Sequence, residues 1–235
     1  MDNGAERYIL RENVAEAPNI KTLKLAREDG APHRFIPGQF ITVYFPELGT
    51  PQGKAYSISS APDETEIAIT VKRIGVFSNR LADLRPGDTV EASTPYGYFY
   101  SDSNETPLVM AAGGIGITPF RSIILDSLKK TPKRKLSLFY SARTAADLAF
   151  KSVLDECERR STCRVQYFVT REVAAPRGMA SGRMSATALA AAAEGDATAE
   201  FMLCGSIPFV RDLWRGLRAE GIDEGRIYTE AFFSH

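Results

Sequence analysis

The pattern of the chain changes once, and this change constrains the fold more than any other feature. From residue 8 to residue 100, short runs rich in Val, Ile, Thr, Tyr and Phe are broken by Gly and Pro, a pattern typical of an antiparallel barrel or sandwich. After the polar stretch 101–106, strand-like and helix-like runs alternate, which is typical of a parallel sheet covered by helices on both faces. With 235 residues the chain is long enough for two cores. We therefore expect two domains, residues 1–102 and 103–235.

The local patterns predict the elements of each half. The first half is expected to hold strands over 20–25, 39–45, 55–59, 66–72 and 89–93, with one short helix over 78–84 that follows Gly75 and has Ser78 as its N-cap. The second half is expected to hold strands over 108–111, 136–140, 165–169, 201–204 and 226–230. Its helices are expected after Thr118, with Pro119 at the first helical position, and over 150–157, 186–193 and 210–217.

Charge and residue usage exclude several classes of protein. The formal net charge is zero, so the chain lacks the basic field that nucleic-acid binding depends on. The cysteines Cys157, Cys163 and Cys204 form no close pair and the two histidines lie far apart, so we expect no metal site and no iron–sulfur cluster. Residues 1–11 have no signal-peptide pattern and no apolar run is long enough to cross a bilayer. We expect a cytoplasmic protein with neither a membrane nor a nucleic acid as partner.

A glycine-rich turn at residues 113–119 is the strongest local signal for ligand binding. It reads Gly-Gly-Ile-Gly-Ile-Thr-Pro and lies between a predicted strand and a predicted helix. Glycines allow a pyrophosphate to approach the backbone, and the free N–H groups of a helix start favour anionic oxygen. Pro119 stands where a dinucleotide fingerprint would have its third glycine. A tight structural turn is the alternative interpretation.

Two segments of the first half carry weaker signals of the same kind. Residues 75–78, Gly-Val-Phe-Ser, offer a second helix start, which is either an anion site or an ordinary capped turn. Lys54 and Tyr56 share one face of a predicted strand, so that a cation and an aromatic ring could contact one ligand together. An ordinary edge strand is the alternative there.

Taken in order, these motifs resemble the ferredoxin–NADP reductase superfamily over nearly the whole chain. The resemblance rests on residues 37–40, 54–57, 75–78, on Pro95, Gly97 and Phe99, on residues 113–119, on Cys204 and Gly205, and on residues 230–232. It implies an N-terminal antiparallel Greek-key β-barrel that binds FAD, followed by a C-terminal α/β Rossmann-like parallel sheet that binds NAD(P), without an iron–sulfur domain.

The resemblance also implies a set of FAD contacts. Tyr56 would contact the flavin, Ser57 would lie beside its N5 atom, and Phe232 would cover the flavin face where nicotinamide stacks. Phe233 shares that position, and packing of a C-terminal strand is the alternative role for both rings. Lys54 replaces the family's usual arginine, so a point charge replaces a bidentate fork. The full set of FAD contacts is Lys54, Ala55, Tyr56, Ser57, Val71, Lys72, Gly75, Phe77, Ser78, Thr118 and Phe232.

For the nicotinamide nucleotide, the resemblance implies contacts from Gly113, Gly114, Gly116, Thr118, Pro119, Arg143, Thr170, Arg171, Arg183, Cys204 and Gly205. Cys204 would lie under the nicotinamide ring, with the role of a small core residue as the alternative. Ser206 follows Gly205 where the family usually has proline. Guanidinium groups near residues 170–183 favour NADPH over NADH, because they suit a 2′-phosphate. Arginines that merely solvate a loop are the alternative.

The function implied is hydride transfer from NADPH to FAD and onward transfer of electrons to a separate acceptor such as ferredoxin or flavodoxin, with Ser57, Cys204 and Glu230 as catalytic residues. The alternatives are an NADH-dependent reductase component of an oxygenase, a free-flavin reductase, and a flavin-binding electron-transfer or regulatory subunit without catalysis. The basic run 129–135 either docks an acidic partner or solvates a helix end. We expect a monomer or a weak dimer.

Overall fold

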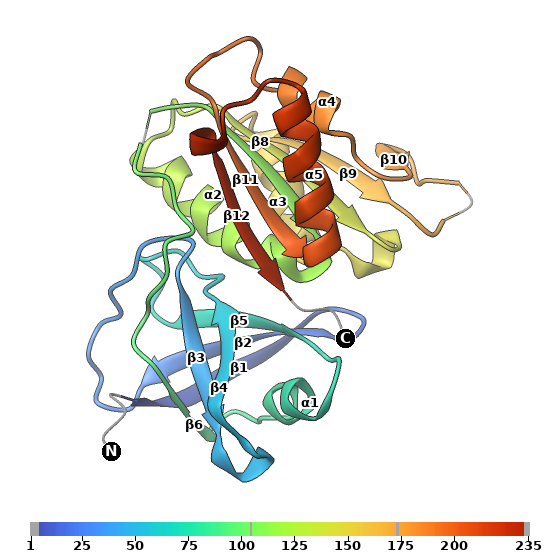
Figure 1. Cartoon of the computed structure of the whole chain (residues 1–235). Helices are drawn as coiled ribbons and strands as arrows, with labels where there is room; N and C mark the ends of the chain where they lie inside the picture. The colour runs from blue at the N-terminus through green and yellow to red at the C-terminus, as the bar shows by residue number, and fades with distance from the viewer. Residues whose placement is uncertain (1–4, 104, 173, 233–235) are drawn as a thin grey trace.

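The computed structural model describes residues 5–103, 105–172 and 174–232, and in these ranges it contains two sheets. In Figure 1 the N-terminal sheet lies below and the C-terminal sheet with its helices lies above. The N-terminal strands are β1 (Glu6–Ala17), β2 (Ile20–Arg27), β3 (Phe40–Phe45), β4 (Thr50–Ser57), β5 (Ile67–Lys72) and β6 (Thr89–Ala92).

The N-terminal sheet is an antiparallel barrel with the strand order β4-β3-β6-β1-β2-β5. The first and last strands of that order meet just beyond β4, because Ile58 forms a bridge with Ile69 of β5 and the Ser59 N–H donates to the Ala68 carbonyl at 2.8 Å. Large apolar side chains that are almost inaccessible to solvent, such as Leu23 and Ile41, fill the interior. The predicted antiparallel β-barrel is confirmed.

The short helix α1 (Val76–Ala82) lies between β5 and β6. It begins two residues earlier than predicted, and its N-cap is Gly75, not Ser78. Ser78 is the third residue of the helix, and its hydroxyl accepts from the N–H groups of Ile74 and Gly75 at 2.9 and 3.0 Å. A serine three residues after the cap that bonds back to the turn looks like an N-cap in sequence, which explains the error.

The C-terminal sheet is parallel throughout, with the order β10-β9-β8-β7-β11-β12. Its strands are β7 (Leu108–Gly113), β8 (Leu136–Ala142), β9 (Arg164–Val169), β10 (Met179–Ser181), β11 (Glu200–Ser206) and β12 (Ile227–Phe232). Its helices are α2 (Thr118–Lys130), α3 (Lys151–Arg159), α4 (Ala186–Ala191) and α5 (Ile207–Ala219). A 3-10 turn, η2 (Gly114–Ile117), separates β7 from α2, so Thr118 is the first residue of α2 and not its cap.

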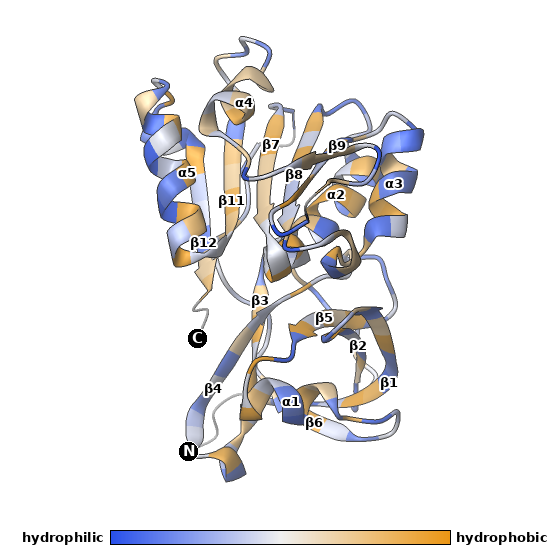
Figure 2. Cartoon of the chain, turned by 90° about the vertical axis from the view of Figure 1, so that its right-hand side faces the viewer, coloured by the Kyte–Doolittle hydropathy of each residue, from blue (hydrophilic) through white to orange (hydrophobic). Residues whose placement is uncertain are grey.

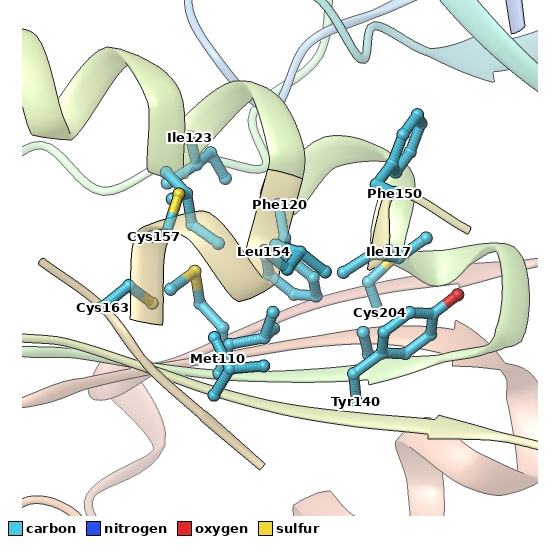
Figure 3. Packing of buried hydrophobic residues seen from close by; sticks show 14 of the residues in the cluster. Met110, Ile117, Phe120, Ile123, Tyr140, Phe150, Leu154, Cys157, Cys163 and Cys204 are labelled. Atoms are coloured by element: carbon cyan, nitrogen blue, oxygen red, sulfur yellow. The ribbon is translucent and has the colours of Figure 1, made fainter. Parts of the chain in front are cut away.

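Helices cover both faces of the parallel sheet, α2 and α3 on one side and α4 and α5 on the other (Figure 2). Side chains alternate along β7, so Met110 packs with Phe120 and Leu154 on one face while Val109 and Ala111 pack on the other. Figure 3 shows the first of these cores. Burial on both faces accounts for the unbroken apolar runs that predicted a parallel sheet.

Packing and polar contacts join the two sheets. The rings of Phe99 and Phe120 lie 5.8 Å apart between centroids. Arg121 of α2 donates to the Ser59 carbonyl at 2.6 Å and pairs with Glu64 at 3.1 Å. These contacts fix α2, and the turn before it, against the barrel. Within the described ranges, we find no helix of the length and apolar character that a membrane span needs.

Candidate functional site

Ser57 and Glu230 meet where the two sheets face each other. Ser57 is the last residue of β4, and Glu230 lies near the end of β12, whose arrow in Figure 1 points from the parallel sheet to the barrel. The Ser57 hydroxyl donates to the Glu230 Oε1 atom at 3.5 Å. Ser57 itself is only 4% exposed. Both residues were predicted to be catalytic, and the structure brings them together.

The other oxygen of the Glu230 carboxyl, Oε2, is buried without a hydrogen-bond partner among the described residues. Burial raises the pKa of Glu230 to about 7, and the Ser57 hydroxyl lowers it by a smaller amount. A buried polar atom without a partner is unfavourable unless a ligand or water satisfies it. The carboxyl is therefore placed to contact a ligand that enters between the sheets, and it exchanges a proton near neutral pH.

Lys54 and Tyr56 lie on one face of β4, as predicted, and both contact Phe77 of α1. The Lys54 Nζ atom lies 5.6 Å from the centroid of the Phe77 ring, and the rings of Tyr56 and Phe77 are nearly parallel with centroids 6.4 Å apart. Lys54 and Ala55 are exposed and Tyr56 is half-buried, with the pKa of its hydroxyl raised by burial. A cation and an accessible aromatic surface thus lie along the strand that ends at Ser57.

The turn before α1 presents apolar groups to solvent next to open backbone. Ile74 and Val76 are 54% and 73% exposed, and no heavy atom lies within 4 Å of a Cβ built on Gly75. Exposed apolar side chains on both sides of a glycine at a helix start leave room for a flat ligand with a charged tail. Of the other predicted contacts, Lys72 is half-buried and Val71 is only 1% exposed, so Val71 offers mainly its backbone. The residues on this side of the barrel fit a flavin dinucleotide.

Close packing explains one glycine of the turn after β7. A Cβ on Gly116 would lie 2.2 Å from the carbonyl oxygen of Cys204, so no larger residue fits there. Gly114 has a φ of +57° and open space around it. Thr118 and Pro119 are buried, and the Thr118 hydroxyl donates to the Ile115 carbonyl at 2.7 Å. The turn thus presses against the end of β11 while its outer side, at Gly114, remains free.

Cys204 and Gly205 lie at that end of β11. Cys204 pairs in register with Glu230 of β12, but its side chain is fully buried, beside Ile117 and Tyr140 (Figure 3). Burial, with a smaller effect of Glu230, raises the pKa of the thiol well above its ordinary value. Phe232 is half-buried and pairs with Ser206. Phe233, the second aromatic residue considered for stacking, lies outside the described residues.

A cavity of about 510 Å³ opens at the carboxyl ends of the parallel strands. Its lining includes Arg143, Thr170, Arg171 and Arg183, which were predicted to bind the nucleotide, but not Arg177, another arginine of the segment 170–183. The lining also includes residues that were not predicted to bind the nucleotide, among them Ser141, Ser206, Pro208, Phe209 and Asp212. Because ligands of open α/β sheets bind beyond the carboxyl ends of the strands, positions just after each predicted strand were the signal that could have identified Ser141 and Ser206.

The arginines of this cavity have no acidic partner in the described ranges, where neither Arg143, Arg171 nor Arg183 takes part in an ion pair. Asp212 pairs with its neighbour Arg211 at 2.8 Å. The carboxylate of Glu172 accepts from the Ala145 N–H at 2.6 Å. Exposed guanidinium groups that converge on one cavity without acidic partners are suited to a phosphate dianion.

Comparisons with known proteins agree with this geometry. The model of the oxidoreductase FAD-binding domain matches residues 8–100, and that of the oxidoreductase NAD-binding domain matches residues 110–214. A ferredoxin–NADP reductase B of Sorangium cellulosum is 30% identical over 92% of this chain and 93% of its own length. A flavohemoprotein of Rhizobium meliloti is 32% identical over 97% of this chain, which spans 60% of that relative. In structure, the flavohem-like FAD/NAD binding domain of a nitric oxide dioxygenase from Vibrio cholerae matches with a TM-score of 0.86 at 27% identity, covering 97% of this chain and 99% of the other.

Proposed function

The chain belongs to the ferredoxin–NADP reductase family of FAD- and NAD-binding oxidoreductases, and from this premise we propose that it transfers a hydride from NADPH to FAD and passes the electrons to a separate acceptor protein. We place the boundary between its FAD-binding and NAD(P)-binding domains at residues 102 and 103. FAD, when bound, supplies a ring that accepts a hydride and releases the electrons one at a time.

The contact between Ser57 and Glu230 carries this proposal. It joins the strand assigned to the flavin with the strand end assigned to the nicotinamide, at 3.5 Å between the two side chains. Ser57 would donate a hydrogen bond to the flavin edge. The Glu230 carboxyl, whose Oε2 has no partner within the described ranges, would orient the nicotinamide. Both residues act by holding two rings in one geometry, which is where such enzymes gain most of their rate.

The other assigned residues hold or position the two ligands. Lys54 and Tyr56 would contact the pyrophosphate and the flavin, and Phe232 would cover the flavin until nicotinamide replaces it. Cys204 would act mainly through position, because its thiol is buried while its strand carries Gly205 and pairs with Glu230. The turn around Gly114 would receive the nucleotide's phosphates.

NADPH is the proposed donor because the arginines in the cavity form no ion pair with any of the residues that the structure describes. A 2′-phosphate placed there would satisfy Arg143, Arg171 and Arg183, whereas the ribose hydroxyls of NADH would leave these charges without a counter-ion. An NADH-specific site usually places a free acid at the ribose. Asp212 is an acid of this lining, but it pairs with Arg211.

Rates of flavin reduction with NADPH and NADH test the choice of nucleotide. For the variants Arg171→Ala and Arg183→Ala we expect the loss of kcat/KM with NADPH to be about 10- to 100-fold, the effect of losing a charged hydrogen bond, and the values with NADH to be nearly unchanged. Arg177→Ala is the matched control, since Arg177 is exposed nearby but does not line the cavity. Equal losses with both nucleotides would contradict the 2′-phosphate assignment.

Ferredoxin or flavodoxin is the first proposed class of acceptor, supported by the relative named ferredoxin–NADP reductase, which this chain matches over almost its full length. A heme protein is the second, supported by the flavohemoprotein relatives, in which this chain corresponds to about 60% of the length. Reduction of ferredoxin, flavodoxin and a globin by the FAD-loaded chain, compared at one NADPH concentration, discriminates between the two. A rate with the globin that exceeds both others would favour the second class.

A further inference from the structure

Phe209 packs its ring directly on two glycines that belong to different strands. Phe209 lies in the first turn of α5, and a Cβ built on Gly113, the last residue of β7, would lie 3.0 Å from the ring. A Cβ built on Gly205 of β11 would lie 2.8 Å from the same ring. A side chain at position 205 would therefore force the ring to shift, and one at position 113 would press closely against it.

The ring occupies the position in the sheet where a dinucleotide is expected. β7 is flanked by β8 on one side and by β11 on the other, although β8 follows it in sequence and β11 comes much later. The strand order therefore reverses between β7 and β11, and ligands of open α/β sheets bind outside the strand ends at such a reversal. Phe209 fills the space above the two glycines at that point.

Phe209 also lines the arginine cavity, together with Arg143, Arg171 and Arg183. Its ring packs on Gly205, the residue after Cys204, and Cys204 pairs in register with Glu230. A nucleotide that holds its 2′-phosphate at the arginines and its nicotinamide near Glu230 must pass over Gly113 and Gly205. The ring and the middle of the ligand cannot occupy that space together.

The ring has room to move. Phe209 is half-buried, not enclosed, and the cavity of about 510 Å³ lies beside it. A change of its side-chain rotamer would carry the ring from the glycines toward solvent and would remove its packing on the sheet.

We propose that Phe209 is a specificity-determining residue of the nucleotide site, whose ring the nicotinamide half of the ligand must displace. This inference rests on the proposed function. The displacement lowers the affinity for the whole dinucleotide, because only the fraction of molecules with the ring displaced is competent to bind it. A ligand that reaches only the arginine end leaves the ring in place and is not affected.

The test compares two ligands on the FAD-loaded protein by calorimetric titration. Adenosine 2′,5′-bisphosphate carries the 2′-phosphate but no nicotinamide, whereas NADP⁺ carries both. For Phe209→Ala we expect the Kd of NADP⁺ to fall about fivefold or more and the Kd of the bisphosphate to stay within about twofold. Ile207→Ala is the matched control, since Ile207 is 41% exposed in the same helical turn and does not line the cavity. It should change neither Kd.

Phe209→Leu keeps an apolar side chain on the sheet and replaces the alanine variant if that variant does not fold or retain FAD. The Kd of NADP⁺ should also fall in Phe209→Leu, but by a smaller factor than in Phe209→Ala. An unchanged or weaker affinity for NADP⁺ in the Phe209 variants, with a wild-type protein that binds both ligands, overturns this inference and leaves the proposed function intact. A wild-type protein that binds neither ligand overturns both.

Discussion

The Ser57 hydroxyl lies 3.5 Å from the Glu230 carboxylate although the two residues are 173 positions apart in the chain. One comes from the last residue of a barrel strand and the other from the last strand of the parallel sheet. The two sheets therefore meet at the residues that the resemblance assigns to hydride transfer.

Removing either partner of this contact should slow flavin reduction more than it weakens binding. We expect Ser57→Ala and Glu230→Gln to lower the rate constant of reduction by NADPH about 10- to 100-fold, because the rings lose their fixed geometry, with little change in FAD content. Stopped-flow absorbance of the flavin measures this rate. Thr229→Val, at the exposed position before Glu230, is the control. A normal rate in both test variants would exclude a catalytic role for the pair.

Glu230 should make stability depend on pH in the flavin-free chain. Burial raises its pKa from 4.5 to about 7, so the folded chain holds a proton in that range that the unfolded chain releases. The resulting stabilisation is complete below about pH 4.5 and is lost as the pH rises through 7, and it amounts to roughly 3 kcal/mol. Glu230→Gln lacks this term. In urea unfolding, the free energy of unfolding of the variant relative to the wild type should therefore increase by about that amount between pH 5 and pH 8. A difference between the two proteins that does not change with pH would contradict the raised pKa of Glu230.

Lys54 should limit the affinity for FAD. Its ammonium lies beside the Phe77 ring and can offer a pyrophosphate a point charge, whereas arginine would offer a bidentate fork. We expect Lys54→Arg to tighten FAD binding and Lys54→Met to weaken it, each by several-fold or about 1 kcal/mol. Quenching of FAD fluorescence on binding gives the two dissociation constants. Equal constants for the two variants would place Lys54 away from the cofactor.

Arg134 should stabilise the segment between the two sheets. Its side chain is 4% exposed and pairs with Glu200 at 3.5 Å, and it also donates to the Thr106 carbonyl at 2.8 Å and to the Ser101 hydroxyl at 3.0 Å. Arg134→Met leaves a buried carboxylate without its cation, which should lower the free energy of unfolding by about 3 to 5 kcal/mol.

Lys130→Met is the control for Arg134, since Lys130 pairs with Asp126 at the surface and should contribute about 0.5 kcal/mol or less. Adding Glu200→Gln to Arg134→Met should restore part of the loss, because the buried charge is then removed. Chemical denaturation of the three variants measures these losses. Similar losses for Arg134→Met and Lys130→Met would contradict a stabilising role for the buried Arg134 side chain.

Substitutions at Gly113 and Phe209 should have non-additive effects on the free energy of unfolding. Gly113→Ala places a Cβ 3.0 Å from the Phe209 ring and should cost about 1 to 3 kcal/mol. In a Phe209→Ala background most of this cost should disappear. Gly205→Ala is the comparison, because its Cβ would also lie 3.2 Å from the Gly113 Cα and Phe209→Ala should rescue it less. A double-mutant cycle by urea unfolding measures the coupling, and simple additivity of Gly113→Ala and Phe209→Ala would exclude it.

Much of the fold could be predicted because local patterns and tertiary structure agree. The predicted strand 20–25 and helix 210–217 fall within β2 (Ile20–Arg27) and α5 (Ile207–Ala219). β1 (Glu6–Ala17) was missed because register shifts between Leu10 and Glu12 and between Ala15 and Ala17 break its alternation of apolar and polar residues. The short β10 (Met179–Ser181) carries no pattern of its own and is defined by its pairing with β9.

The candidate site could be predicted as a set of motifs but not as a geometry. The arginines near residue 171 were identified through the family resemblance, whereas Phe209 belongs to no motif and is recognised only from its position over two glycines. The burial of the Cys204 thiol likewise depends on Ile117 and Tyr140, which come from other elements of the fold. Contacts between distant segments determine these properties, and no local window of sequence contains them.

The most direct test of the central claim is the absorbance of the FAD-loaded chain, recorded without oxygen while NADPH is added. The claim is that the two halves hold a flavin and a nicotinamide in contact at Ser57 and Glu230. It predicts that the visible absorbance band of the flavin bleaches on NADPH addition, quickly in the wild type and slowly in Glu230→Gln. A chain that takes up FAD and keeps its colour with both NADPH and NADH would contradict it.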